Sequence, residues 1–481
     1  MSRFKKLTAL LLAAVIAFSF AACGKNKDKE DGKSEDVKTI AETSDLILPY
    51  SREDGVNPFA ATSLVNEVIM PLMYDSLFEM DETYKPQPSL ASASTVTGKI
   101  VTVTIDNTRT FTDGSRISAN DIVYSFEKAQ ESPYYGSALE KFRYARARGD
   151  DTVIFMLEEN NAYAAADLTF PIVESGTAND EDSVPIGTGR YYYQPTDNGE
   201  NGGILKDSGL HEEKTKAKQI FLANMTGSDS LLYSLAIGNI NATFDDLSKG
   251  SLDRVSVSKE PVPLNNMEVV QIRGAVADAP VRRYISALLD RNSLVSSGMD
   301  GYGEAASLPF NPKWYVCKDI TQKDKVDTDK AKEAIKNAFK DKETISIVTN
   351  KDNAFKVNMA EELASQLKSL GIQTEVEQLS TQDYQTAVNT VSYDICIAEY
   401  RLTNDMDVSS FLQGDVLEAY KDMLDETGSP EEFIKAFNKE MPFIVIGFRD
   451  GVLAYSRYLE TDAKVLPGNP YANVYEWTVR S

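Results

Sequence analysis

Few residues in this chain have the chemistry of a catalytic or metal-binding centre. His211 is the only histidine among 481 residues and stands in a polar stretch, KDSGLHEEKTKAK. A histidine-based catalytic pair would need His211 itself, and a histidine-rich metal site is excluded. The sequence has no C-x-x-C spacing, glycine-rich phosphate loop or G-x-S-x-G motif, and no paired carboxylates of the kind that hydrolases use stand out. We expect no catalytic residue, metal or cofactor, and an exposed side chain at His211.

The charge and the cysteines narrow the classes of partner further. A formal net charge of −23 argues against nucleic acid and against docking on anionic lipid by charge, because both need a basic face. The three cysteines are Cys23, Cys317 and Cys396. In an exported protein Cys317 and Cys396 either form a disulfide or remain as buried thiols, and the sequence leaves both alternatives open.

The first 42 residues have the composition of an export signal followed by a tether. Basic residues precede an apolar segment, 7–20, that is too short for an ordinary membrane span and ends in a lipobox-like Ala-Ala-Cys-Gly. We predict that 1–22 is a lipoprotein signal peptide and that lipidated Cys23 anchors the chain to the outer face of a membrane. A plain secretory signal with an incidental cysteine is the alternative. The polar residues 23–42 are predicted to be a disordered tether.

Residues 98–129 combine three local signals with little sequence between them. The β-branched run Ile100–Ile105 has apolar side chains at period 2, which predicts a strand. Thr112-Asp113-Gly114 is typical of a tight turn in which the glycine has a positive φ. Ser118 then precedes an apolar pattern at helical spacing, which predicts a helix N-terminus there.

A second group of elements predicts a parallel sheet. Residues 345–348 favour a strand, 360–370 a helix, and 372–376 another strand. Such β-α-β alternation places the two strands side by side and parallel. Since 481 residues are too many for one compact core, we expect two lobes or more.

Several segments, in the right order, resemble the family 5 extracellular solute-binding proteins, which are the oligopeptide, dipeptide and nickel receptors of ABC importers. The signature "strand, F-x-D-G, A-x-D-I-V-x-S-F" lies within 98–129, although Phe111 stands where Trp is usual. The resemblance extends from about Leu46 to Trp477, with Asn241 replacing a usual Asp. Its other segments are 74–77, 185–192, 281–292, 367–372 and 393–397.

The resemblance implies an α/β, two-lobed periplasmic-binding-protein-like fold of type II, from the large cluster with an extra subdomain, in which a hinge joins the lobes. Lobe I is then discontinuous, formed by 43–74, 184–272 and 441–481. The extra subdomain is 75–183, and lobe II is 273–440.

The resemblance also implies a function. It predicts a lipid-anchored, extracellular or periplasmic receptor, monomeric and not an enzyme, that binds a peptide between its lobes and delivers it to the permease and ATPase of an ABC importer. The alternatives are a receptor for nickel, a metallophore or another small solute, a receptor without an importer, and an extracellular hydrolase of cell-envelope material.

The candidate ligand residues lie in two loops. Family members fix a peptide's α-ammonium with an Asp in the loop after the 393–397 strand, and here the register falls on Asn404 or Asp405. Only a carboxylate neutralises an ammonium in a closed cleft, which selects Asp405 with Asp407 as second choice. A solvated acidic loop is the alternative. The predicted ligand-binding residues are Asp405, Asn404, Asp407, Tyr400 and Arg401, with Ala61, Thr62 and Ser63 opposite.

Overall fold

Helices and strands follow one another along most of the chain in the computed structural model, which describes residues 45–196, 202–225, 227–249, 256–274, 276–320 and 326–480. The chain divides into two units, 1–42 and 43–481. The predicted signal peptide, tether and lipidated Cys23 lie outside the described residues, so they stay predictions. Every element below belongs to the second unit.

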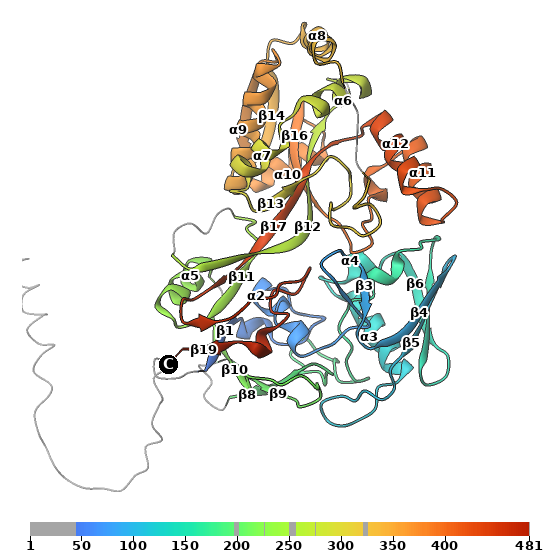
Figure 1. The fold of residues 1–481 in the computed structure, drawn as a ribbon, viewed down its shortest axis with the longest axis vertical. Coiled ribbons are helices and arrows are strands. Elements are labelled where there is room, and N and C mark those ends of the chain that lie inside the picture. Colours follow the sequence, from blue (N-terminus) through green and yellow to red (C-terminus); the bar gives the residue numbers. More distant parts are fainter. Residues whose placement is uncertain are drawn as a thin grey trace, which may run out of the picture. The chain divides into compact units, whose positions relative to one another are not determined.

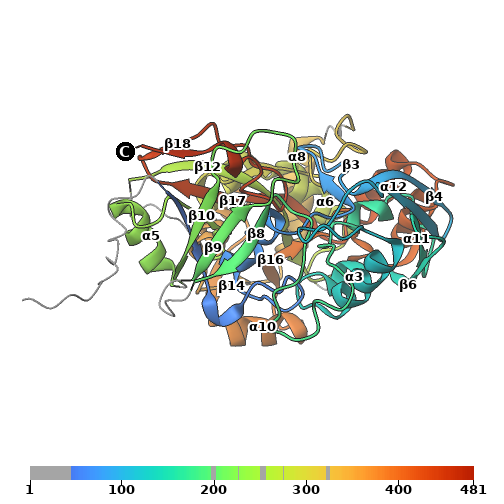
Figure 2. The same ribbon diagram turned by 90° about the horizontal axis from the view of Figure 1, so that it is seen from below.

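The chain enters the fold through a four-stranded sheet, in the order β1-β10-β9-β8. Strand β1 pairs with β10 in parallel, and the remaining pairs are antiparallel. Figure 2 shows β8, β9 and β10 lying side by side. The strands are β1 (Leu46–Tyr50), β8 (Tyr191–Pro195), β9 (Gly203–Asp207) and β10 (Gln219–Asn224).

A second four-stranded sheet, antiparallel throughout, forms the body of the predicted extra subdomain. Its order is β4-β5-β7-β6. Helix α3 (Ala119–Glu131) packs on it, and the Phe126 ring lies 5.4 Å from that of Phe155 between ring centroids. The sheet contains β4 (Ala91–Thr97), β5 (Ile100–Ile105), β6 (Phe142–Ala147) and β7 (Thr152–Leu157).

The local predictions for 98–129 are confirmed. Strand β5 spans the β-branched run, and its residues alternate between buried and wetter positions. Gly114 has φ +91°, a left-handed conformation that glycine adopts without strain. Helix α3 begins after Ser118, whose backbone N–H donates to the Asp121 carboxylate at 2.9 Å. This bond satisfies one of the backbone donors left free at a helix start.

The largest sheet has the order β11-β17-β12-β16-β14-β15, with β13 pairing to β17. The predicted β-α-β arrangement is confirmed, because β14 runs parallel to both β15 and β16. The pairs among β12, β16 and β17 are antiparallel, so the sheet is mixed. Its strands are β11 (Ala242–Asp245), β12 (Ser258–Ile272), β13 (Gly303–Ala305), β14 (Ile345–Asn350), β15 (Thr374–Leu379), β16 (Ile395–Arg401) and β17 (Ile444–Tyr455).

Helices surround this sheet. Figure 1 shows α9 beside β14, and it shows α11 and α12 on the opposite side of the sheet from α9. Contacts of α7 with α9, of α6 with α8 and of α11 with α12 link them in pairs. They are α6 (Ala279–Leu288), α7 (Arg291–Gly298), α8 (Thr328–Phe339), α9 (Ala354–Ser369), α10 (Thr381–Asn389), α11 (Gly414–Leu424) and α12 (Pro430–Glu440).

The short elements complete the fold. Strands β2 and β3 form a two-stranded sheet, as do β18 and β19. They are β2 (Phe78–Met80), β3 (Pro86–Pro88), β18 (Leu459–Glu460) and β19 (Thr478–Val479), with the helices α2 (Leu64–Glu67), α4 (Gly136–Leu139) and α5 (Ser228–Ile237) and the 3₁₀ helix η4 (Ala164–Asp167).

Two long strands, β12 and β17, connect the two lobes. In Figure 1 they run from the vicinity of β11 to that of β14 and β16. Their pairing is interrupted between Pro263 and Asn266 and again between Glu268 and Val269. Strand β12 ends at Ile272 and β17 begins at Ile444, near the predicted boundaries at 272/273 and 440/441, which remain predictions. Paired strands of this kind suit a hinge, since a few irregular positions absorb the change in backbone angles.

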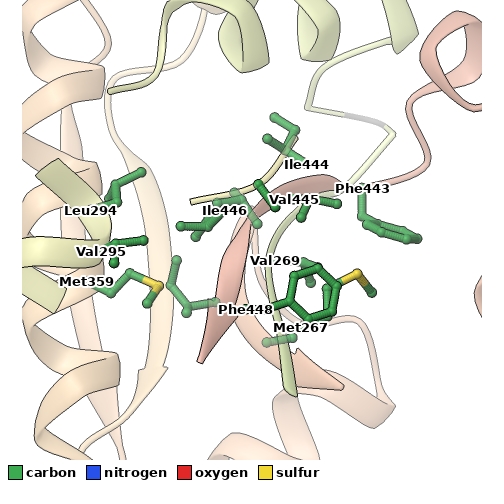
Figure 3. Packing of buried hydrophobic residues seen from close by; sticks show 14 of the residues in the cluster. Met267, Val269, Leu294, Val295, Met359, Phe443, Ile444, Val445, Ile446 and Phe448 are labelled. Carbon is green, nitrogen blue, oxygen red and sulfur yellow. The ribbon is translucent and has the colours of Figure 1, made fainter. Parts of the chain in front are cut away.

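The hydrophobic core of the helix-covered lobe is centred on β17. Figure 3 shows Ile446 on the side of the α7 residues, whereas Val445 and Phe448 lie on the side of the β12 residues. Ile446 is fully buried in this cluster. On the α7 side lies Leu294, and on the β12 side Met267, both also buried. A second core is built mainly from β1, β5, β7 and α3, and it also includes Leu453, Tyr471 and Trp477 from the end of the chain.

We predict that Ile446→Ala destabilises the protein by about 2–5 kcal/mol, because the deletion removes buried methylene contacts and leaves a cavity. Ile237→Ala, at a position that is 50% exposed on α5, is the matched control and should change stability little. Thermal unfolding of both variants measures the difference. Equal melting temperatures for the two would show that this core does not carry the stability assigned to it.

Candidate ligand-binding cavity

The main cavity has a volume of about 390 Å³ and is walled by segments that are far apart in sequence. The walls come from the α2 region, from the predicted extra subdomain, from the loop after β16, and from the β12 and C-terminal segments at 263–265 and 466–469. Its size is typical of sites for small ligands. The lining residues fall within 67–84, 133–139, 167–171, 263–265, 401–404 and 466–469.

The structure brings two of the predicted ligand residues, Arg401 and Asn404, to the cavity wall. The Arg401 guanidinium lies over the Tyr134 ring, 4.9 Å from its centroid, and Nη2 donates to the Tyr134 hydroxyl at 2.8 Å. The Asn404 side chain donates to Thr169 Oγ1 at 3.1 Å. The loop and the extra subdomain are therefore in direct contact along this wall.

Tyr400 and Asp407 lie outside the cavity lining. The Tyr400 ring packs against Phe411, with 4.1 Å between centroids, and Gln271 Nε2 donates to its hydroxyl. Asp407 accepts from the Ser409 backbone N–H at 2.8 Å. Contacts of either residue with a ligand stay predictions.

Ala61, Thr62 and Ser63 also lie outside the lining, but they place a residue that belongs to it. Asp54 accepts from the Thr62 backbone N–H at 2.9 Å and from the Ser63 hydroxyl at 2.7 Å, which fixes the start of α2. Glu67, the last residue of α2, lines the cavity. Glu67 was not among the residues predicted to bind a ligand.

Asp405 lies directly behind the cavity wall and has partners from the protein itself. Its Oδ2 accepts from Lys141 Nζ at 2.5 Å and from Asn161 Nδ2 at 2.7 Å, and its Oδ1 accepts from Thr403 Oγ1 at 2.5 Å. Lys141 Nζ also pairs with Asp167 Oδ2 at 2.7 Å. The predicted contact of Asp405 with a ligand ammonium stays a prediction, whereas the ammonium that it meets in this structure is that of Lys141.

The charges in this cluster depend on one another. Burial alone would raise the pKa of Asp405, but the Lys141 ammonium and the hydrogen bonds hold it below its usual value. Burial and the neighbouring Asp405 carboxylate raise the pKa of Asp167. Burial opposes the charge of Lys141, yet the two aspartates raise its pKa. The arrangement therefore keeps Lys141 and Asp405 charged and makes Asp167 the easiest of the three to neutralise.

Glu67 lines the cavity, as Glu79 and Asp167 do, and it interacts electrostatically with Arg401. Burial raises the pKa of Glu67 to about 7, and the Arg401 guanidinium partly offsets that effect. A carboxylate and a guanidinium thus line the same cavity without forming an ion pair within 4.0 Å. Groups of opposite charge placed in this way suit a ligand that carries charges of both signs.

The prediction that the His211 side chain is exposed was wrong. Its side chain is only 18% exposed, and its buried Nε2 has no hydrogen-bond partner among the described residues. Burial lowers the pKa of His211 to about 4, and Arg190 and Arg109 add to that effect. Nε2 lies 3.8 Å from Asp75 Oδ2, an oxygen that already accepts from Arg109 at 2.7 Å. A polar sequence context concealed the fact that the loop folds back onto Asp75.

Cys317 and Cys396, for which the sequence left two alternatives, are both buried free thiols. Burial raises the pKa of Cys317 to about 12 and that of Cys396 to about 11. Neither thiol is therefore activated as a nucleophile, since the reactive species is the thiolate.

The ion cluster makes a prediction about the ligand-free protein. Asp405→Asn leaves Lys141 and Asp167 with incomplete partners in a buried place, and should lower the free energy of unfolding by on the order of 3 kcal/mol. Asp407→Asn is the matched control, because Asp407 lies 4.0 Å from Lys141 and is one-third exposed, and should cost less than about 1 kcal/mol. Denaturant titration of both variants measures this, and indistinguishable midpoints would contradict the assigned importance of Asp405.

Comparison with known proteins identifies the family. The family model for bacterial extracellular solute-binding proteins, family 5 Middle, matches residues 85–418. The oligopeptide-binding protein AppA of Bacillus subtilis is 24% identical over 444 residues, which cover 81% of this chain and 80% of that protein. Protein XP55 of Streptomyces lividans is 27% identical over 328 residues, covering 63% of this chain and 59% of that protein.

Solved structures share the fold. The ABC transporter substrate-binding protein CtaP of Listeria monocytogenes has a TM-score of 0.72 at 20% identity, with 91% of this chain and 99% of that chain covered. Bacillus subtilis AppA in complex with a nonapeptide has a TM-score of 0.60 at 19% identity, with 91% and 99% covered. NikZ of Campylobacter jejuni in complex with Ni(L-His) has a TM-score of 0.63 at 19% identity, with 90% and 99% covered. This chain belongs to family 5 of the bacterial extracellular solute-binding proteins and has their two-lobed α/β fold.

Proposed function

We propose that the protein is a lipid-anchored receptor that binds a peptide in the cavity between its lobes and delivers it to an ABC importer. The observation that carries the proposal is the cavity itself, which the helix α2 region, the extra subdomain and the loop after β16 enclose together. A ligand that touches all three parts favours their approach, so binding and closure are coupled. The named relative that binds oligopeptides supports a peptide as the ligand.

The wall offers groups that match a peptide. Asn265, Thr403 and Asn404 bring amide and hydroxyl groups to the wall. These groups have partners within the protein, as Thr403 has in Asp405, so a ligand main chain would share or replace those hydrogen bonds. Arg401 suits a carboxylate, since a guanidinium binds it through two parallel hydrogen bonds. Glu67 suits an ammonium or guanidinium. These five residues define the ligand contacts that we propose.

Nickel and metallophore complexes are less well supported as ligands. Among the described residues no three His, Cys, Asp or Glu side chains are grouped so that they could hold a metal ion. The wall that we describe is instead rich in amide, hydroxyl and aromatic groups. Family and fold are those of solute-binding proteins, and we propose no catalytic activity.

Ligand binding should stabilise the protein and bring its lobes together. A pool of short peptides should raise the melting temperature by mass action and reduce the radius of gyration in small-angle scattering. Arg401→Ala should weaken binding by about 2–5 kcal/mol for a peptide with a free carboxylate and less for its amide. Lack of saturable binding by any peptide would contradict the proposed ligand, and binding with an unchanged radius would contradict closure.

The anchor is tested separately. None of the helices in the part of the chain that the structure describes is long and apolar enough to cross a membrane. We expect the wild type to sediment with membranes and Cys23→Ala to lose its lipid. The matched control is Cys317→Ala, which also removes one cysteine but should remain with the membrane. Identical partition of wild type and Cys23→Ala into detergent would contradict lipidation at Cys23.

A further inference from the structure

Directly behind the cavity wall lies a small ionic site whose cation is a side chain of the protein itself. We infer that Asp167 and Asp405 form a binding site for a primary ammonium and that Lys141 fills it, so that a ligand needs no free amino group there. The statement that a ligand needs no free amino group rests on the proposed peptide-binding function. It predicts a receptor that accepts peptides with blocked and with free amino termini alike.

The geometry is that of an ammonium held by two carboxylates. Lys141 Nζ lies 2.5 Å from Asp405 Oδ2 and 2.7 Å from Asp167 Oδ2. Both carboxylates have side chains with no exposed surface. An ammonium has three hydrogen-bond donors and no acceptor, so two converging carboxylates in a buried place are well matched to it.

The remaining acceptor positions are also used. Asp167 Oδ1 accepts from the Asn404 backbone N–H at 2.9 Å, and Asp405 Oδ1 accepts from Thr403 Oγ1 at 2.5 Å. Each of the four carboxylate oxygens therefore has a donor within the protein. An incoming ligand ammonium would first have to displace Lys141, which would leave a second ammonium to be solvated or paired elsewhere.

The site adjoins the cavity. Asp167, Thr403 and Asn404 all line the cavity, whereas Asp405 lies immediately behind them. In Lys141→Ala, two buried carboxylates would lie beside the cavity wall with no cation between them. Unpaired buried charges carry a free-energy penalty, and an ammonium at this position would neutralise them. A molecule that carries an ammonium should therefore bind there.

The first experiment tests the ammonium site without any peptide. Lys141→Ala should have a lowered melting temperature, and n-propylammonium, which replaces the deleted atoms, should raise it more than tetramethylammonium at equal ionic strength. Lys421→Ala is the matched control, since Lys421 pairs with Glu159 across the same junction but is 43% exposed. It should lose little stability and gain nothing from n-propylammonium. A variant that stays unfolded even with n-propylammonium, or gains no more from it than the wild type does, would overturn the ammonium site.

The second experiment tests specificity with trialanine and N-acetyl-trialanine, measured by calorimetry. We expect the wild type to bind the two within about threefold, and Lys141→Ala to prefer the free-amino form by about tenfold or more. A tenfold free-amino preference in the wild type that disappears in Asp405→Asn would overturn the inference, as would no gained preference in Lys141→Ala. Failure of both peptides to bind the wild type would remove the peptide function and the specificity claim together, while the amine rescue would still decide the ammonium site.

Discussion

The Lys141 ammonium links three parts of the chain that lie far apart in sequence. Two buried carboxylates, on Asp167 and Asp405, would repel each other and cost several kcal/mol without a cation between them. Lys141 comes from the turn before β6, Asp167 from the end of η4, and Asp405 from a loop 264 residues further along the chain than Lys141. Lys141 thus acts together with the bonds of Asn404 to Asp167 and of Arg401 to Tyr134 in holding that loop at the cavity wall.

A second ion cluster lies at the end of β16, just before the loop that lines the cavity. Arg449 of β17 lies 2.5 Å from Glu399 of β16, and Lys356 of α9 lies 2.7 Å from Glu399. Burial alone would raise the pKa of Glu399, but these two cations hold it well below its usual value. Glu399 is two residues before Arg401, so the cluster fixes the end of β16 from which the cavity loop begins. Ion pairs therefore join the hinge strand β17 to the end of β16 that precedes the cavity loop.

Strands and helices that depend on neighbouring residues were predicted from the sequence. Side-chain contacts between residues far apart in the chain were missed. Strand β5, helix α3 and the parallel β14 and β15 follow from side-chain periodicity and turn residues, which neighbouring positions supply. The loop after β16 was also located, but not the direction in which each side chain points. Met406 has φ +61°, an uncommon conformation for a residue other than glycine. Here Asn404 faces the cavity and Asp405 faces inward, a difference that no spacing rule reveals.

Lys141 was missed for a physical reason. A lysine before a strand has no feature that distinguishes a buried counter-ion from a solvated side chain, because its role is decided by a partner far along the chain. His211 shows the reverse case, since a polar stretch suggested exposure although folding buries the ring. Whether a charged side chain is buried in this protein depends on its tertiary contacts, whereas its helices and strands depend largely on neighbouring residues.

The most direct measurement is a crystal structure of the wild type with a free-amino tripeptide bound. We expect Lys141 Nζ to remain within hydrogen-bonding distance of both Asp167 and Asp405, and the peptide to lie in the cavity against Arg401 and Asn404. A complex in which the peptide ammonium contacts Asp405, with Lys141 displaced, would contradict the assignment of Lys141 as the resident ammonium.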